Sequence, residues 1–153
     1  MNIFILDENP IQAAKWLCDK HVIKMALETA QLLCGAHYKK QTIYSAPYHA
    51  THLQHPCSVW VRKSIDNYRW LVHHGLTISK EYTERYKKKH KSQSVIEWCR
   101  DNEPTLPKIG LTEFAIAVKG QIVGNTPVEI YRNYYRTDKK RFATWKQNKP
   151  YWF

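Results

Sequence analysis

The stretch CDKHVIKMALETAQLL, residues 18–33, has the composition of a buried helix and decides the fold class. At 100° per residue, one narrow stripe of this helix is mainly apolar, yet His21 and Glu28 lie within it. Apolar side chains also occupy the opposite side, so we predict a helix that is central to the fold. The stripe consists of Ala14, Leu17, Cys18, His21, Met25, Glu28 and Leu32.

The flanking residues predict where this helix begins and ends. Asn9 suits the N-cap and Pro10 the first helical position, whereas Gly35 suits the position after the last turn. The preceding MNIFIL is predicted to be a short strand or an extended arm. Residues 38–55 are predicted to form an irregular connection, and a loop of this length is more often functional than filler.

The remaining sequence also favours helices. A second long helix is expected to begin near Pro56 and to be bent or interrupted at Gly75. Ser94 and Glu97 have capping-box spacing before the short helix VIEWCRDN. The sequence TPVE, residues 126–129, gives a stronger start signal before VEIYRNYYR.

The fold class follows from these elements. Residues 103–125 are expected to be mostly loop, and no alternating pattern is long enough to predict a sheet. We find no internal repeat or linker. The prediction is a mainly α protein: one compact helical domain over residues 1–153, with a long central helix and extended loops.

Composition and charge narrow the function. The formal net charge of +11 favours a partner that carries phosphate, although a solvated lysine-rich surface is the alternative. Four dispersed cysteines without a CxxC pair suggest neither a disulfide framework nor a four-cysteine zinc site. No secretory signal or long apolar window is present, so we expect a soluble intracellular protein.

His21 and Glu28 are the first candidate site residues. They lie about 10 Å apart along the helix axis, which suits two side chains that line one cleft. A buried carboxylate needs a partner or a pocket, and it can act as a general base or stabilise a cation. In the alternative interpretation, Lys24 and Glu28 form a solvated i,i+4 pair and His21 is a core histidine.

The loop YHATHLQHPCSVW, residues 48–60, is rich in histidine. The spacing of His49, His52, His55 and Cys57 matches no zinc motif, so we predict no metal site. Instead, we expect His52 or His55 to contact a phosphate or a base, with Ser58 available at the N-terminus of the next helix, where backbone N–H groups favour anions. A surface or capping role for each histidine is the alternative.

The C-terminal segment YRNYYRTDKKRFATWKQNKPYWF, residues 131–153, alternates basic and aromatic side chains. Basic groups neutralise phosphates and aromatic faces stack on unpaired bases, at about 1–3 kcal/mol per base. In the alternative interpretation, several of the aromatic residues hold the tail on the core. DNA contact and docking of the tail can occur together. The expected DNA contacts here are Arg136, Lys140, Arg141, Trp145 and Lys146.

Three segments resemble a known family, the pyrimidine-dimer DNA glycosylases of the phage endonuclease V type. Residues 17–33 are similar to the family's first helix, in which an Asp-x-His element is followed seven residues after the His by the catalytic Glu, as in His21 and Glu28. Residues 55–82 resemble its next long helix, and residues 142–153 its basic aromatic C-terminus. The whole chain is also similar to small phage proteins assigned to this family.

The resemblance implies a compact, mainly helical, metal-independent enzyme without a cofactor. It implies attack of the N-terminal α-amine on the sugar C1′ to give an imine, with Glu28 stabilising the intermediate and promoting β-elimination. Two departures matter. Asn2 is bulky, so Met1 is expected to stay and to supply the amine. The family's two arginines beside the glutamate correspond to Leu27 and Gln31.

These observations lead to one functional prediction with two alternatives. We predict a DNA N-glycosylase, with possible abasic-site lyase activity, for damaged or modified pyrimidines. The alternatives are a nucleotide N-glycosidase or related nucleotide-processing enzyme on the same scaffold, and a non-enzymatic DNA-binding protein. We expect a cytoplasmic monomer in a phage-infected host, with no membrane partner. The expected catalytic residues are Met1, His21, Lys24 and Glu28, and further substrate contacts are Gln31, His52, His55, Ser58, Trp60 and Arg62.

Overall fold

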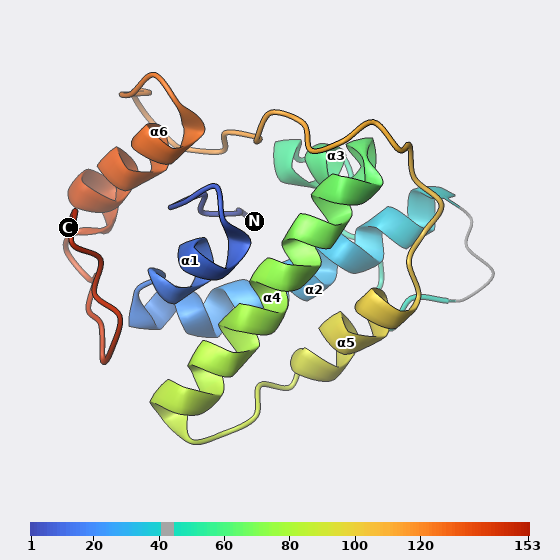
Figure 1. Cartoon of the computed structure of the whole chain (residues 1–153), viewed down its shortest axis with the longest axis horizontal. Coiled ribbons are helices and arrows are strands. Elements are labelled where there is room, and N and C mark those ends of the chain that lie inside the picture. Colours follow the sequence, from blue (N-terminus) through green and yellow to red (C-terminus); the bar gives the residue numbers. More distant parts are fainter. Residues whose placement is uncertain (41–44) are drawn as a thin grey trace.

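The computed structural model describes residues 1–40 and 45–153. Over these residues the protein is mainly α, as predicted, and no strand is present (Figure 1). Residues 41–44, part of the predicted connection 38–55, lie outside the described residues. The elements are α1 (Pro10–Lys15), α2 (Asp19–Lys40), α3 (Pro56–Lys63), α4 (Ile65–Tyr86), α5 (Gln93–Asp101), α6 (Pro127–Tyr134) and the π-helical turn η1 (Tyr135–Lys139).

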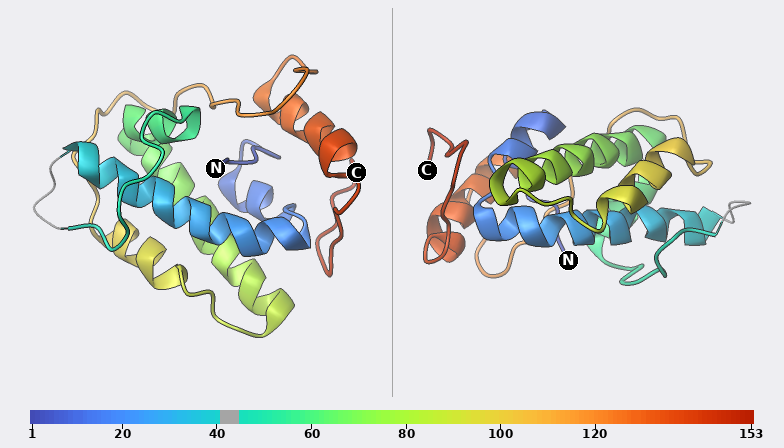
Figure 2. Two further views of the ribbon diagram at one scale, coloured as in Figure 1. Left: turned by 180° about the vertical axis from the view of Figure 1, so that it is seen from behind. Right: turned by 90° about the horizontal axis from the view of Figure 1, so that it is seen from below.

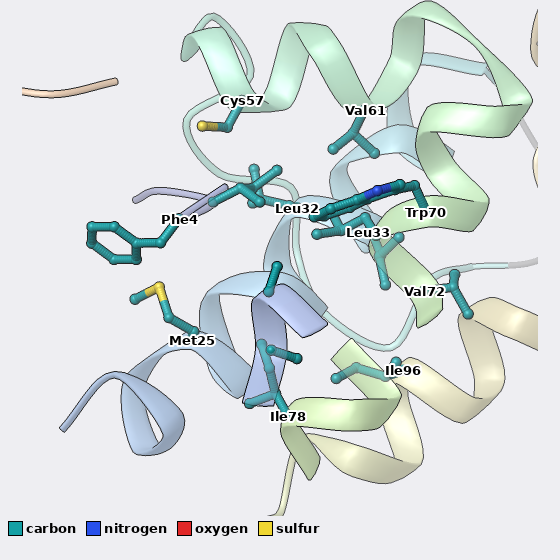
Figure 3. Packing of buried hydrophobic residues seen from close by; sticks show 14 of the residues in the cluster. Phe4, Met25, Leu32, Leu33, Cys57, Val61, Trp70, Val72, Ile78 and Ile96 are labelled. Carbon is teal, nitrogen blue, oxygen red and sulfur yellow. The ribbon is translucent and has the colours of Figure 1, made fainter. Parts of the chain in front are cut away.

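The core lies where α4 crosses α2, with α1 and α5 packed alongside (Figures 1 and 2). Leu32 and Leu33 of α2 meet Trp70 of α4 in this layer (Figure 3). Gly75 lies at the helix crossing, where a Cβ atom would stand 2.6 Å from Cγ2 of Thr29. The predicted interruption at Gly75 is therefore wrong: α4 is continuous, and the glycine permits close approach of two helices.

The predicted first helix is in fact two helices. Asn9 caps α1 as expected, accepting a hydrogen bond from the backbone N–H of Ile11 at 2.9 Å. However, α1 ends at Lys15, and α2 begins at Asp19 and continues through Gly35. The cause is a distant side chain. The buried guanidinium of Arg85 donates to the main-chain oxygens of Lys15 and Leu17 and to the Asp19 carboxylate, which holds the chain in a turn.

The second long helix is also divided, but at Ser64. The Ser64 backbone is extended, and its hydroxyl accepts a hydrogen bond from the Asn67 N–H at 3.0 Å, so it caps α4. The next residue, Ile65, donates its N–H to the main-chain oxygen of Pro107. A cap and a long-range hydrogen bond therefore satisfy the backbone where the two helices part.

The later helix starts agree partly with the sequence pattern. Thr126 caps α6 as predicted, because its hydroxyl accepts from the N–H of Glu129 at 3.2 Å. In contrast, α5 begins earlier than predicted, with Ser92 rather than Ser94 before its first turn.

Two segments outside the helices shape the site: the N-terminal arm before α1 and the long connection between α5 and α6. MNIFIL is an extended arm rather than a strand, and its residues 3–6 are buried in the core. The N-terminus lies between α3 and α6, and residues 103–125 run from α5 past α3 to α6 without forming a helix (Figures 1 and 2). Within the described part of the chain, every helix is too short or too polar to cross a bilayer.

Candidate active site

A cavity of about 590 Å³ lies beside the first residues of the chain. Its wall combines the N-terminal arm, α2, the start of α3, the connection near residue 117 and the α6–η1 segment. The cavity therefore exists only in the folded chain, since these segments are far apart in sequence. It is lined by Met1, Asn2, Phe4, His21, Lys24, Met25, Glu28, His55, Pro56, Ile116, Ala117, Val118, Lys119, Tyr134 and Lys139.

Glu28 is buried, with 7% of its surface exposed, and its carboxylate contacts three nitrogen atoms. Oε2 accepts a hydrogen bond from the backbone N–H of Asn2 at 2.8 Å and lies 3.9 Å from the α-amino nitrogen of Met1. Oε1 lies 3.4 Å from Nζ of Lys24, whose side chain is largely exposed. The i,i+4 pair thus exists, but the carboxylate belongs to the cavity and its charge is compensated there.

The side chain of Asn2 fixes the position of the first amine. Its Nδ2 donates to the main-chain oxygen of Ala117 at 2.9 Å, and its Oδ1 accepts from the hydroxyl of Tyr131 at 2.8 Å. Tyr131 is fully buried, and its hydroxyl also accepts from the N–H of Ala117. Asn2 therefore ties the arm both to α6 and to the long connection, which leaves Met1 next to Glu28.

His21 is held in an aromatic environment at the other end of the cavity. Its Nδ1 is hydrogen-bonded to the hydroxyl of Tyr135, and its ring stacks on Phe4 with centroids 4.2 Å apart. Burial, with the nearby charges of Lys139 and Lys24, lowers the pKa of His21 to about 3. The imidazole is consequently neutral near pH 7, which suits a packing and hydrogen-bonding role better than proton donation.

His55 combines a capping role with a place in the cavity wall. It is the N-cap of α3, where its Nδ1 accepts a hydrogen bond from the N–H of Cys57 at 3.2 Å. Burial is the main cause that lowers the pKa of His55, followed by the N-terminal amine and by His52. A neutral ring with an accepting Nδ1 leaves Nε2 as the N–H donor.

The other expected contacts of this region lie outside the cavity wall. Gln31 is half-buried on α2, and His52 is exposed in a left-handed turn with φ of 51°. Arg62 donates to the main-chain oxygen of Leu53 at 2.8 Å and so supports the loop before α3.

Ser58 and Trp60, two further expected substrate contacts, are buried and lie outside the cavity wall. The Trp60 ring packs against Trp70 and Phe114. Sequence spacing could not reveal this, because the aromatic partners come from α4 and from the long connection.

The structure confirms that aromatic residues of the C-terminal segment hold the tail on the core. Trp145 donates its indole N–H to the main-chain oxygen of Trp16, and the backbone N–H of Lys146 donates to the Asp19 carboxylate, so the tail is docked on the core. Arg136, Lys140 and Arg141 are exposed and outside the cavity wall. Their charged groups remain accessible to a polyanion.

Several cavity residues were not among the predicted site residues. Asn2 and Phe4 lie in the arm, where the sequence analysis named only Met1 as a site residue. Lys119, Tyr134 and Lys139 come from the last third of the chain. The sequence did point to Tyr134 and Lys139, since both belong to the basic aromatic segment, residues 131–153.

Among the described residues, no group of three or more His, Cys, Asp or Glu side chains is arranged to hold a metal ion.

A primary amine beside a buried carboxylate is an arrangement that an enzyme with an amine nucleophile can use. The sequence comparison is more specific. Residues 1–94 match the family model described as pyrimidine dimer DNA glycosylase, and the chain belongs to this family of enzymes that act on DNA. No match was found among curated proteins or among solved structures.

The family match covers only part of the cavity. Met1, Glu28, His21, Lys24 and His55 all lie within residues 1–94. The opposite wall, from the long connection and the α6–η1 segment, lies beyond the matched residues.

Proposed function

We propose that this protein is a DNA N-glycosylase for damaged or modified pyrimidines and that it also cleaves abasic sites. One observation carries the proposal: the Met1 amine lies 3.9 Å from the buried Glu28 carboxylate, in the wall of a cavity of about 590 Å³. α-Amino groups lose their proton more readily than lysine side chains, which favours them as nucleophiles near neutral pH.

In the proposed reaction, the Met1 nitrogen attacks C1′ of the target sugar. The N–C1′ bond forms as the glycosidic bond breaks, and the bond's electron pair leaves with the base. Loss of a proton from nitrogen and opening of the sugar ring give an imine. Glu28 stabilises the positive charge near C1′ and accepts a proton. Removal of a C2′ proton then expels the 3′ phosphate and breaks the strand.

Charge around the cavity supports a DNA substrate. The side chains of Lys24 and Lys119 lie in the cavity wall. Together with the exposed basic residues of the C-terminal segment, they can neutralise phosphates on either side of a target nucleotide. Since C1′ is inaccessible within a stacked duplex, the nucleotide has to be unstacked before it meets the amine.

The site accommodates either of two N-termini. With Met1 present, its α-amine is 3.9 Å from Glu28. If Met1 is removed, the amine becomes the Asn2 nitrogen, which is 2.8 Å from the same oxygen in the intact chain. Borohydride trapping of the imine tests the proposal on both forms. The substrates are duplexes with a cyclobutane dimer or an abasic site.

We expect a covalent adduct at the first residue of each unblocked form and none when the N-terminus is acetylated. The proposal fails if acetylation leaves trapping unchanged or if the glycosidic bond of the damaged pyrimidine is not cleaved. We call this cleavage base release, although a base in a cyclobutane dimer stays joined to its neighbour through the cyclobutane ring. Faster hydrolysis of free nucleotides than of the duplex would favour the nucleotide N-glycosidase. Tight, salt-sensitive DNA binding without base release would favour the non-enzymatic alternative.

A further inference from the structure

The cavity has an aromatic end that the proposed reaction does not yet use. The rings of Phe4 and His21 stack there, and Tyr134 adds a third ring with its centroid 6.5 Å from that of Phe4. His21 is two turns of α2 from Glu28, about 10 Å along the axis. The amine and carboxylate therefore occupy one end of the cavity, and the aromatic rings the other. A nucleotide whose sugar meets Met1 would direct its base toward the rings.

Tyr134 and Lys139 form a polar pair at this aromatic end. Nζ of Lys139 donates a hydrogen bond to the Tyr134 hydroxyl at 3.1 Å and lies 4.3 Å from the ring centroid. Both side chains line the cavity, and Tyr134 is 9% exposed. Because the phenol oxygen accepts from an ammonium group, its own O–H becomes a stronger donor. None of the described residues accepts that hydrogen, so it is available to a ligand.

Pyrimidine departure creates a need for such a donor. When the glycosidic bond breaks, its electron pair moves onto N1 and the adjacent C2 carbonyl oxygen of the base. A preorganised donor aimed at developing negative charge accelerates such a step. His21 cannot supply a proton near pH 7, since burial and the two nearby lysines keep its ring neutral. Lys139 is the cation in contact with Tyr134.

We propose that Tyr134 is a catalytic residue that donates a hydrogen bond to the C2 oxygen of the departing pyrimidine, and that Lys139 is a positioning residue that polarises it. This inference rests on the proposed function. The step balances: the base leaves with the electron pair of the broken bond and takes a proton from the Tyr134 hydroxyl. Tyr134 regains its proton from the Lys139 ammonium, which solvent reprotonates.

Comparison of glycosidic-bond cleavage with abasic-site cleavage tests whether Tyr134 acts on the departing base or on the site as a whole. Cleavage of the glycosidic bond in dimer-containing duplex requires a departing pyrimidine, whereas strand cleavage at an abasic site does not, although both use the same amine and Glu28. Tyr134→Phe keeps the ring and its packing on Phe4 but removes the hydroxyl. Lys139→Met removes the ammonium, and Lys139→Arg restores a cationic donor.

In single-turnover assays we expect base release to fall about 100-fold or more in Tyr134→Phe, the effect of losing one donor to developing charge. Lys139→Met should lose less, and Lys139→Arg should recover most of that loss. Abasic-site cleavage, duplex affinity and melting temperature should stay close to wild type in all three. Lys88→Met and Tyr48→Phe are matched controls, because neither residue lines the cavity.

Two results would overturn the inference. One is an equal loss of base release and abasic-site cleavage, which indicates a general effect on the site. The other is a loss in Lys139→Met that follows weaker duplex binding and a smaller salt dependence, which identifies Lys139 as a phosphate contact. If wild-type protein releases no base, the proposed function fails as well. If it does and the variants match it, only this inference fails.

Discussion

Replacement of Glu28 by glutamine should abolish most of the activity while leaving the fold almost intact. Glutamine has the same shape as glutamate, so its amide oxygen can accept the hydrogen bond from the Asn2 N–H that Oε2 now accepts at 2.8 Å. The amide nitrogen then faces Lys24, 3.4 Å from Oε1. Because the Lys24 side chain is 68% exposed, it can turn into solvent, whereas the Met1 α-amino group, 3.9 Å from Oε2, loses its carboxylate partner.

The expected cost to stability follows from these contacts. Loss of the ion pairs with Lys24 and with the Met1 α-amino group costs about 0–1 kcal/mol each. Weakening a charge-assisted hydrogen bond to a neutral one costs about 1 kcal/mol more. The sum lowers the melting temperature by only a few degrees for a chain of this size. Removing a preorganised charge from the reacting centre should, by contrast, slow base release by about 10²–10³-fold.

Both quantities can be measured on one preparation of Glu28→Gln, by thermal unfolding and by single-turnover base release. Glu84→Gln is the matched control, because Glu84 forms an i,i+4 pair with Lys80 and does not line the cavity. A Glu28→Gln rate within a few-fold of wild type would refute a catalytic role. Unfolding at the assay temperature would refute the account of its contacts.

Further predictions concern stability, measured by urea denaturation. Gly75→Ala should lower the free energy of unfolding by about 1–3 kcal/mol despite the better helix propensity of alanine, because the added Cβ would crowd Thr29. Adding Thr29→Ser should recover part of this stability. A Gly75→Ala variant as stable as wild type would contradict the packing of the two helices described above. Arg85→Met leaves the buried Glu81 carboxylate without its cation and should lower the free energy of unfolding by about 3–5 kcal/mol. A loss below about 1 kcal/mol, as for an exposed ion pair, would contradict this. Burial lowers the pKa of His74 from 6.5 to about 4, so the unfolded chain binds its proton first. The contribution of His74 to the free energy of unfolding should be complete above pH 6.5 and should fall by up to about 1.4 kcal/mol per pH unit toward pH 4. His74→Gln should remove this part of the pH dependence.

Local signals predicted some elements correctly. The Asn9–Pro10 start of α1 and the Thr126 start of α6 need only a side chain that bonds to the next turn, so the pattern is sufficient. The helix class also followed from periodicity. The same signals predicted a helix end at Gly35 and an interruption at Gly75, but both helices continue through these residues. At Gly75 the glycine permits close packing, and in the sequence such a glycine cannot be told from one that breaks a helix.

The sequence by itself determined the helical class, the basic charge and the conflict of an acidic side chain within an apolar stripe. These properties depend on residues close together in the chain, whose spacing fixes which face they share. Only the tertiary structure decided what that acid meets: Asn2, held by Tyr131 and Ala117, brings the first amine to Glu28. Contacts between residues this far apart depend on how all the helices pack, and no local pattern encodes that packing.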